Sequence, residues 1–285
     1  MRDFIRFDES FQKIINEERG ISTELQNLTY DIYDKIADEI KSNKISMFYS
    51  NDIRYKSGEF SYDNFLGRTI KIKYHYYNFI SSEAYRLKCD KINYICRAIN
   101  DYAVEITVYA LSGTIQKVNL LESLVHELEH LYQYNKAGKV FSANEVYEYA
   151  LKLKKECGKW TLPYCIGDAI YLSRRYEQDA YMNGLYTKLM NCEFPSDFDE
   201  AFHNSDIYHA LKRLKFYLGE IKKCKSFPTH LQSVGYTHHK FVKECTKAID
   251  DIQRKMARTY NKALDDYRKK NPLTEKEFFS IKDTF

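Results

Sequence analysis

The stretch VNLLESLVHELEHLYQYN, residues 118–135, decides how the rest of the chain is interpreted. Its apolar residues recur at steps of three and four, the spacing that places side chains on one face of an α-helix. Polar residues fall between them and form the opposite face. The pattern therefore predicts a helix with one buried side, made by Leu121, Leu124, Val125, Leu128, Leu131 and Tyr132.

The same helix carries the pattern H-E-x-x-H at residues 126–130. Residues four apart on a helix lie about 40° from each other around its axis, so His126 and His130 point the same way and can share one metal ion. Glu127 lies about 100° further round, where it can take a proton from a water without binding the metal itself. The spacing predicts two neutral imidazole ligands and a general base. The alternative is an amphipathic helix that carries two histidines by chance.

The residues before this helix predict a small antiparallel sheet. Polar and apolar residues alternate in 68–79 (RTIKIKYHYYNF), 92–99 (INYICRAI) and 102–111 (YAVEITVYAL), which is strand periodicity. A hairpin turn is expected near Gly58.

Helical periodicity dominates on both sides of the sheet. One helical pattern runs from Asp8 to Lys41, with a break near residues 20–22. After the histidine helix, further helices are expected at 143–156, 174–191, 205–223 and 237–269, and a capping-box pattern starts at Thr274. The order predicts an α+β fold, with an N-terminal lobe (1–135) that holds the sheet and the histidines and a helical C-terminal lobe (136–285).

The motif in this setting resembles the zincin metallopeptidases, whose active-site helix carries H-E-x-x-H and follows a small twisted sheet. The metzincin subgroup is excluded, because Gln133 and Lys136 stand where its glycine and final histidine would be. The gluzincin subgroup takes its third ligand from a glutamate on a later helix. The resemblance therefore implies a glutamate ligand in the C-terminal lobe and a cleft between the two lobes.

Three downstream glutamates compete for the position of third ligand. Glu145, in NEVYEYA, is similar to the Asn-Glu start of a thermolysin-type ligand helix but lacks the aspartate that follows it, and Glu148 has no such neighbours. Glu177 stands in RRYEQDAYMNGLY, which looks like the ligand segment of small gluzincins from bacteria and phages. Glu177, Ala180 and Gly184 also share one helical stripe, whose small residues would let this helix come close to the histidines. Glu177 is the preferred ligand, with Glu145 next.

Several other residues are weaker candidates for roles around this site. Asp179 is either a hydrogen-bond acceptor for the outer nitrogen of a ligating histidine or an exposed helix carboxylate. Ser173 is expected to cap the helix 174–191. The segment 136–173 is longer than in compact gluzincins and is expected to form a flap or side lobe. Candidates for stabilising an oxyanion are Tyr171, Tyr176, Tyr181, His203, His209, His230, His238 and His239.

Composition excludes several classes of protein. The 285-residue chain has 44 basic and 40 acidic residues, too even a balance to indicate a nucleic-acid partner. Its basic run at 212–225 is expected to be a solvated helix face. Seven cysteines without a CxxC pair fit neither a disulfide framework nor a thiolate zinc site. No signal peptide and no run of 18 apolar residues is visible, so we expect a soluble, cytoplasmic or phage-associated protein without a membrane partner.

The resemblance implies a zinc-dependent metallopeptidase of gluzincin type. One Zn²⁺ per chain would be held by His126, His130 and Glu177, and Glu127 would be the general base. Strand 102–111 would be an edge strand that pairs with an extended peptide or protein substrate. One alternative is a non-catalytic protein on a zincin scaffold, a structural component of a phage particle or another assembly; another is a metal-free helical interaction module. The oligomeric state is left open.

Overall fold

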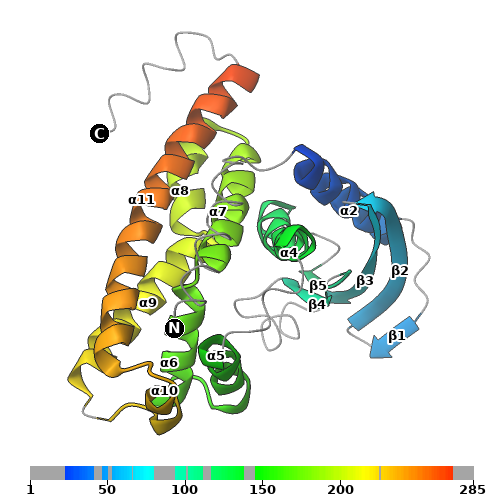
Figure 1. Cartoon of the computed structure of the whole chain (residues 1–285). Coiled ribbons are helices and arrows are strands. Elements are labelled where there is room, and N and C mark those ends of the chain that lie inside the picture. The colour runs from blue at the N-terminus through cyan, green and yellow to red at the C-terminus, as the bar shows by residue number, and fades with distance from the viewer. Residues whose placement is uncertain are drawn as a thin grey trace.

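The computed structural model describes residues 23–41, 47–50, 53–65, 67–79, 94–100, 102–111, 117–137, 145–224 and 226–271. The expected break at 20–22, Cys89, Lys225 and the capping box at Thr274 lie outside these ranges. Figure 1 shows the arrangement: a curved sheet, two helices against one of its faces, and a bundle of helices on the far side of them. The α+β class expected from the sequence is confirmed.

The sheet has five strands and is mixed. The strands are β1 (Met47–Ser50), β2 (Ile53–Phe65), β3 (Arg68–Phe79), β4 (Tyr94–Asn100) and β5 (Ala103–Leu111), in the order β1-β2-β3-β5-β4. Neighbouring strands are antiparallel except β3 and β5, which are parallel. The prediction of a purely antiparallel sheet is therefore wrong. Strand β4 does not pair with β3 but lies at the edge of the sheet, and β5 lies between them. Because β5 is antiparallel to β4, it runs in the same direction as β3.

This strand order also corrects the predicted edge strand. Strand β5 is paired on both sides, with β3 and with β4, so it has no edge to offer a peptide. The edge on this side of the sheet is β4 instead. Pairing order is a long-range property that the alternation of residues within 102–111 does not contain.

One face of the sheet packs against two helices, α2 (Thr23–Lys41) and α4 (Lys117–Ala137). Alternate residues of β3 and β5 are buried on that face, as strand periodicity requires. They meet the apolar side of α4, which is the side predicted from the sequence. The central members of this core are Ile70, Ile72, Tyr74, Tyr76, Val104, Ile106, Val108, Leu124, Val125 and Leu128.

The turn predicted at Gly58 is not present, because β2 is continuous through that residue. Gly58 lies directly opposite Tyr74 of β3, and a Cβ at Gly58 would lie 2.5 Å from the Tyr74 hydroxyl oxygen. Glycine here makes room for a tyrosine ring across the strand pair. The chain turns between β2 and β3 at Gly67, whose φ of 74° favours glycine.

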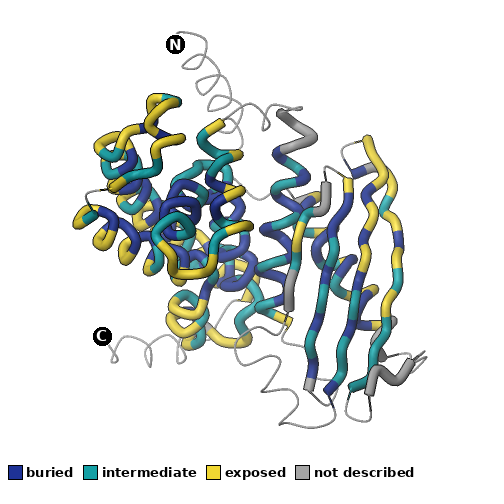
Figure 2. The backbone as a smooth tube through the Cα atoms, turned by 90° about the horizontal axis from the view of Figure 1, so that it is seen from below, coloured by how far each residue is buried: buried dark blue, intermediate teal, exposed yellow. Residues whose placement is uncertain are grey.

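The C-terminal part is helical. The helices are α5 (Glu145–Glu156), α6 (Leu162–Leu172), α7 (Arg175–Met190), α8 (Phe198–His203), α9 (Asp206–Lys223), α10 (Thr229–Ser233) and α11 (His238–Lys270), with a 3-10 turn at Pro195–Asp197. The four helices expected here from periodicity are confirmed. They share a second core, and Figure 2 shows buried segments both in this bundle and beside the sheet. None of the described helices is both long and apolar enough to cross a bilayer.

Helix α6 was not predicted, and it changes the interpretation of residues 136–173. The Thr161 side chain caps its N-terminus and a proline lies in its first turn. Its buried residues, including Ile166 and Ile170, belong to the same core as α9 and α11. The described part of this segment is therefore built into the bundle and is not a flap. Ser173 does not cap α7 as expected, because its hydroxyl donates to the Ala169 carbonyl at the end of α6.

Other expectations concern the surface and the cysteines. In the basic run of α9, Lys212, Lys215, Lys222 and Lys223 are exposed, as predicted, whereas Arg213 is half-buried. The six cysteines within the described ranges are all free.

Helices α5 and α6 touch at Gly167, which gives a test of this packing. A Cβ at Gly167 would lie 2.6 Å from the Ala150 carbonyl oxygen, so Gly167→Ala should lower the free energy of unfolding by about 1–3 kcal/mol, the usual effect of overpacking. The matched control is Gly219→Ala on α9, where a Cβ would meet none of the described atoms within 4 Å and should stabilise the helix by about 0.5–1 kcal/mol. Urea denaturation measures both. Equal effects of the two changes would contradict the close contact.

Candidate metal centre

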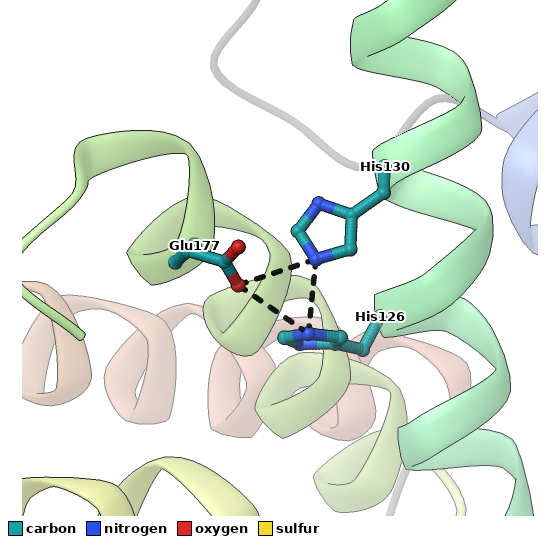
Figure 3. A group of neighbouring side chains, drawn as sticks. All are labelled: His126, His130 and Glu177. Atoms are coloured by element: carbon teal, nitrogen blue, oxygen red, sulfur yellow. Dashed lines mark hydrogen bonds and ion pairs between the residues drawn. The ribbon is translucent and has the colours of Figure 1, made fainter. Parts of the chain in front are cut away.

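Three side chains from two helices meet in a buried cluster: His126 and His130 of α4 and Glu177 of α7 (Figure 3). The two Nε2 atoms are 3.1 Å apart. Glu177 Oε2 lies 3.2 Å from Nε2 of His130 and 3.8 Å from Nε2 of His126. The structure thus brings together the three residues selected from the sequence, with one atom of each turned toward a common point. Such a cluster could hold a metal ion.

The cluster depends on how closely α7 approaches α4. Ala180 is fully buried, and a Cβ at Gly184 would lie 3.0 Å from the Glu122 carbonyl oxygen of α4. The stripe of small residues expected along Glu177, Ala180 and Gly184 is confirmed as the contact face of α7. Because larger side chains are missing there, the short carboxylate of Glu177 reaches the histidines.

The two oxygens of the Glu177 carboxylate have different surroundings. Oε1 accepts a hydrogen bond of 3.1 Å from the Tyr147 hydroxyl of α5, and the Tyr171 hydroxyl also hydrogen-bonds this carboxylate. Oε2 is buried and accepts no well-oriented hydrogen bond from the described residues. Two tyrosines therefore hold the carboxylate, and one oxygen is left directed at the histidines.

The competing glutamates lie outside the cluster. Glu145 and Glu148 are on α5 and both are exposed. Helix α5 presents Tyr147 to Glu177 instead. Sequence reasoning missed Tyr147, although it lies between the two glutamates that were considered; its only signal was its place on the inward side of this helix.

Burial and mutual charge set the protonation of the cluster. Burial, followed by the charge of His130, lowers the pKa of His126 to about 3. Burial alone would also lower the pKa of His130, but the Glu177 carboxylate outweighs it and raises this pKa to about 9. Although burial raises the pKa of Glu177, the two histidines lower it further than burial lifts it. A cation is thus favoured at this point: a proton on His130 in the metal-free chain, or a metal ion in its place.

Glu127 lies beside the cluster and contacts the edge of the sheet. Its Oε2 accepts a hydrogen bond of 2.7 Å from the backbone amide of Ala98 on β4. Burial raises the pKa of this carboxyl group, while the charge of His130 opposes the rise. The structure therefore places a basic carboxylate between the cluster and the edge strand.

A second hydrogen-bond network joins α4 to α7 next to the histidines. The buried Gln133 side chain donates to Glu129 and to the Tyr176 carbonyl, and Asn183 of α7 donates to the other oxygen of Glu129. Gln133 also interacts with the His130 ring. Sequence reasoning used Gln133 only to exclude the metzincins. Its position three residues after His130, on the same helical face, was the signal that it could orient this histidine.

Of the weaker candidates for roles around the site, some tyrosines lie near the cluster, whereas Asp179 and the candidate histidines lie outside it. Asp179 accepts from Lys255 of α11 at 2.6 Å and pairs with Arg175, so it is not the acceptor for a histidine of the cluster. Among the tyrosines, the ring of Tyr181 lies 4.3 Å from that of His126, and the ring of Tyr176 lies 6.3 Å from that of His130. None of the five candidate histidines contacts the cluster within the described residues; they are His203, His209, His230, His238 and His239.

A buried ion pair joins the three helices around the site. Lys188 Nζ of α7 lies 2.7 Å from Glu122 Oε2 of α4, and both side chains are at most 4% exposed. The other oxygen of Glu122 accepts from the Asp206 amide at the start of α9, and Lys188 also donates to the Asn204 carbonyl. The pair fixes α7 and the start of α9 against the helix that carries the histidines.

Comparison of the chain with protein-family models, with curated proteins and with solved structures finds no match in any of the three. The chemistry of the site therefore rests on its geometry and on the motif that led to it.

The buried pair can be tested by removing its cation. Lys188→Met leaves the Glu122 carboxylate buried without its partner and should lower the free energy of unfolding by about 3–5 kcal/mol. Lys223→Met, which breaks an exposed pair with Glu220 on α9, should leave the unfolding midpoint unchanged. Replacing both Glu122 and Lys188 by methionine should recover part of the loss, because no buried charge then remains. A Lys188 variant as stable as the Lys223 variant would refute the bracing role.

Proposed function

We propose that this chain is a zinc-dependent metallopeptidase, with one Zn²⁺ held by His126, His130 and Glu177. The spacing of the three donor atoms carries the proposal. Zinc ligands at about 2.0–2.1 Å in a tetrahedron lie about 3.3–3.4 Å from one another. The separations of 3.1, 3.2 and 3.8 Å bracket that value. Two imidazoles and one carboxylate also match the donors of hydrolytic zinc sites with an open fourth position.

The buried oxygen Oε2 of Glu177 supports the same ligand set. A carboxylate oxygen that is buried without a hydrogen-bond donor is costly unless a cation satisfies it. Tyr147 satisfies the other oxygen, and Tyr171 also hydrogen-bonds the carboxylate, so the two tyrosines fix the direction of the group. Such outer contacts are typical of metal sites, where they orient the ligand.

Glu127 is the general base in the proposed reaction. Zinc bound in the cluster supplies a Lewis acid that makes water nucleophilic at neutral pH and polarises the peptide carbonyl. A Glu127 oxygen takes the proton from the attacking water and then passes it to the leaving amine. Because burial raises the pKa of Glu127, this carboxylate is a stronger base than an exposed one.

The place of β4 favours a peptide as substrate. This edge strand contacts the base directly through Ala98, so an extended peptide paired with β4 would pass beside Glu127. The resemblance to gluzincins, stated above from the motif, is consistent with this reading. A non-catalytic scaffold protein would need the histidines and Glu177 for stability, but it would have no use for a base in this position.

The assignment of the third ligand predicts a difference in zinc content between matched variants. The wild-type chain, purified without chelators and with zinc supplied, should hold about one zinc ion. Glu177→Ala should lose it, because two histidines alone bind zinc weakly, whereas Glu148→Ala on the exposed side of α5 should keep it. Atomic absorption on the purified variants measures this. Full zinc in Glu177→Ala would disprove the ligand set.

The role of Glu127 predicts a variant that keeps zinc and loses turnover. Glu127→Gln preserves size and hydrogen bonding but cannot accept a proton, so hydrolysis of a denatured test protein should fall about 10²–10⁴-fold. Zinc content should not change. If the wild-type chain holds zinc but cleaves no peptide, the scaffold alternative is correct; if Glu127→Gln loses its zinc, Glu127 is a ligand.

A further inference from the structure

Two cations share one buried carboxylate next to the metal centre. Asp168 of α6 has a side chain only 3% exposed. Its Oδ1 lies 3.0 Å from Lys154 Nζ of α5, and its Oδ2 lies 3.3 Å from Arg213 Nε of α9. One cation would neutralise Asp168, so the three side chains together carry an excess of one positive charge.

The excess charge is accessible from outside. The side chains of Lys154 and Arg213 are 24% and 38% exposed. Arg213 uses only Nε for Asp168, and among the described residues its two terminal amino groups have no hydrogen-bond partner. A guanidinium with both terminal groups open is suited to bind a carboxylate through two parallel hydrogen bonds.

Both cations interact with a tyrosine that neighbours one of the metal ligands, Lys154 by direct contact and Arg213 through its charge. Lys154 Nζ lies 3.4 Å from the ring centre of Tyr171, whose hydroxyl hydrogen-bonds Glu177. Tyr181, whose ring lies 4.3 Å from that of His126, also feels the positive charge of Arg213. Tyr171 thus connects Lys154 to Glu177, and the charge of Lys154 also acts on His126. The cationic pair therefore lies near the cluster, where a substrate residue next to the cleaved bond would also lie.

We propose that Lys154 and Arg213 bind a carboxylate of the substrate, so that the enzyme selects peptides with an acidic group near the cleaved bond. This inference rests on the proposed function for its substrate class. The carboxylate belongs either to an aspartate or glutamate side chain or to the C-terminus of the peptide. Both have the same chemistry, and the experiment below distinguishes them.

Binding to the Glu127→Gln chain tests the pair independently of catalysis. The probes are fluorescently labelled alanine-based hexapeptides with one glutamate placed at successive positions, and the same peptides with glutamine in its place. Each probe is made in two forms, with a free and with an amidated C-terminus. Fluorescence anisotropy at fixed salt gives the dissociation constants. We expect at least one peptide with a carboxylate to bind about tenfold or more tightly than its neutral counterpart, as for a hydrogen bond between charged groups.

Three variants assign this preference to the pair. Arg213→Met should abolish most of it and Lys154→Met part of it, while Asp168 keeps one cation in each case and the fold is maintained. Lys212→Met, which removes an exposed charge from the neighbouring position on α9, should leave it intact. If the glutamate-to-glutamine change removes the preference, the ligand is a side chain; if amidation does, it is the C-terminus.

Two results would overturn the inference. One is equal binding of acidic and neutral peptides. The other is an equal loss in the Lys212 and Arg213 variants, since the attraction would then be general and not due to this pair. Neither depends on turnover. A chain that shows the Arg213-dependent preference but cleaves no peptide would retain the anion site and lose the proposed peptidase function.

Discussion

The close contact between α4 and α7 is the constraint on which the site depends. Glutamate has a short side chain, and Glu177 can reach two histidines on a neighbouring helix only where the two backbones nearly touch. Gly184 provides that approach against the Glu122 carbonyl, and the buried Lys188–Glu122 pair holds it. The interhelical distance therefore determines whether three donor atoms converge or remain separate polar groups.

Helix α4 serves two parts of the molecule at once. Its apolar side completes the core of the sheet through Leu124 and Leu128, while His126 and His130 belong to the side that faces α7. Glu127 lies between these sides and meets β4. Because one helix is anchored in the sheet on one side and in the bundle on the other, the two histidines, Glu127 and the edge strand keep fixed relative positions.

The sequence was enough to predict the local features of this site, but not the contacts between segments that are far apart in the chain. Spacing within one helix was enough to select His126 and His130, whereas Glu177 was preferred because its segment resembles a gluzincin ligand helix and shares a stripe with Ala180 and Gly184. The identity of the edge strand could not be found in this way, since it depends on β5 inserting between β3 and β4. Tyr147 was missed for a related reason, because its hydrogen bond to Glu177 joins two helices and spans thirty residues of sequence. Nothing in NEVYEYA shows whether this tyrosine would bond Glu177 or only pack against other side chains.

Two buried carboxylates, Glu122 and Asp168, lie near the cluster, and they are neutralised in different ways. Glu122 is paired with one lysine that is almost completely buried and also bonds the backbone, so the charges balance and no donor of that pair reaches solvent. Asp168 is paired with two cations that are both partly exposed, one of them with its terminal donors open. Each of these cations bonds one oxygen of Asp168, so both contribute to the contact between the helices, but together they carry one positive charge more than the carboxylate neutralises. The contacts are explained by the stability of the bundle, whereas the excess charge is what a negatively charged ligand from outside would neutralise.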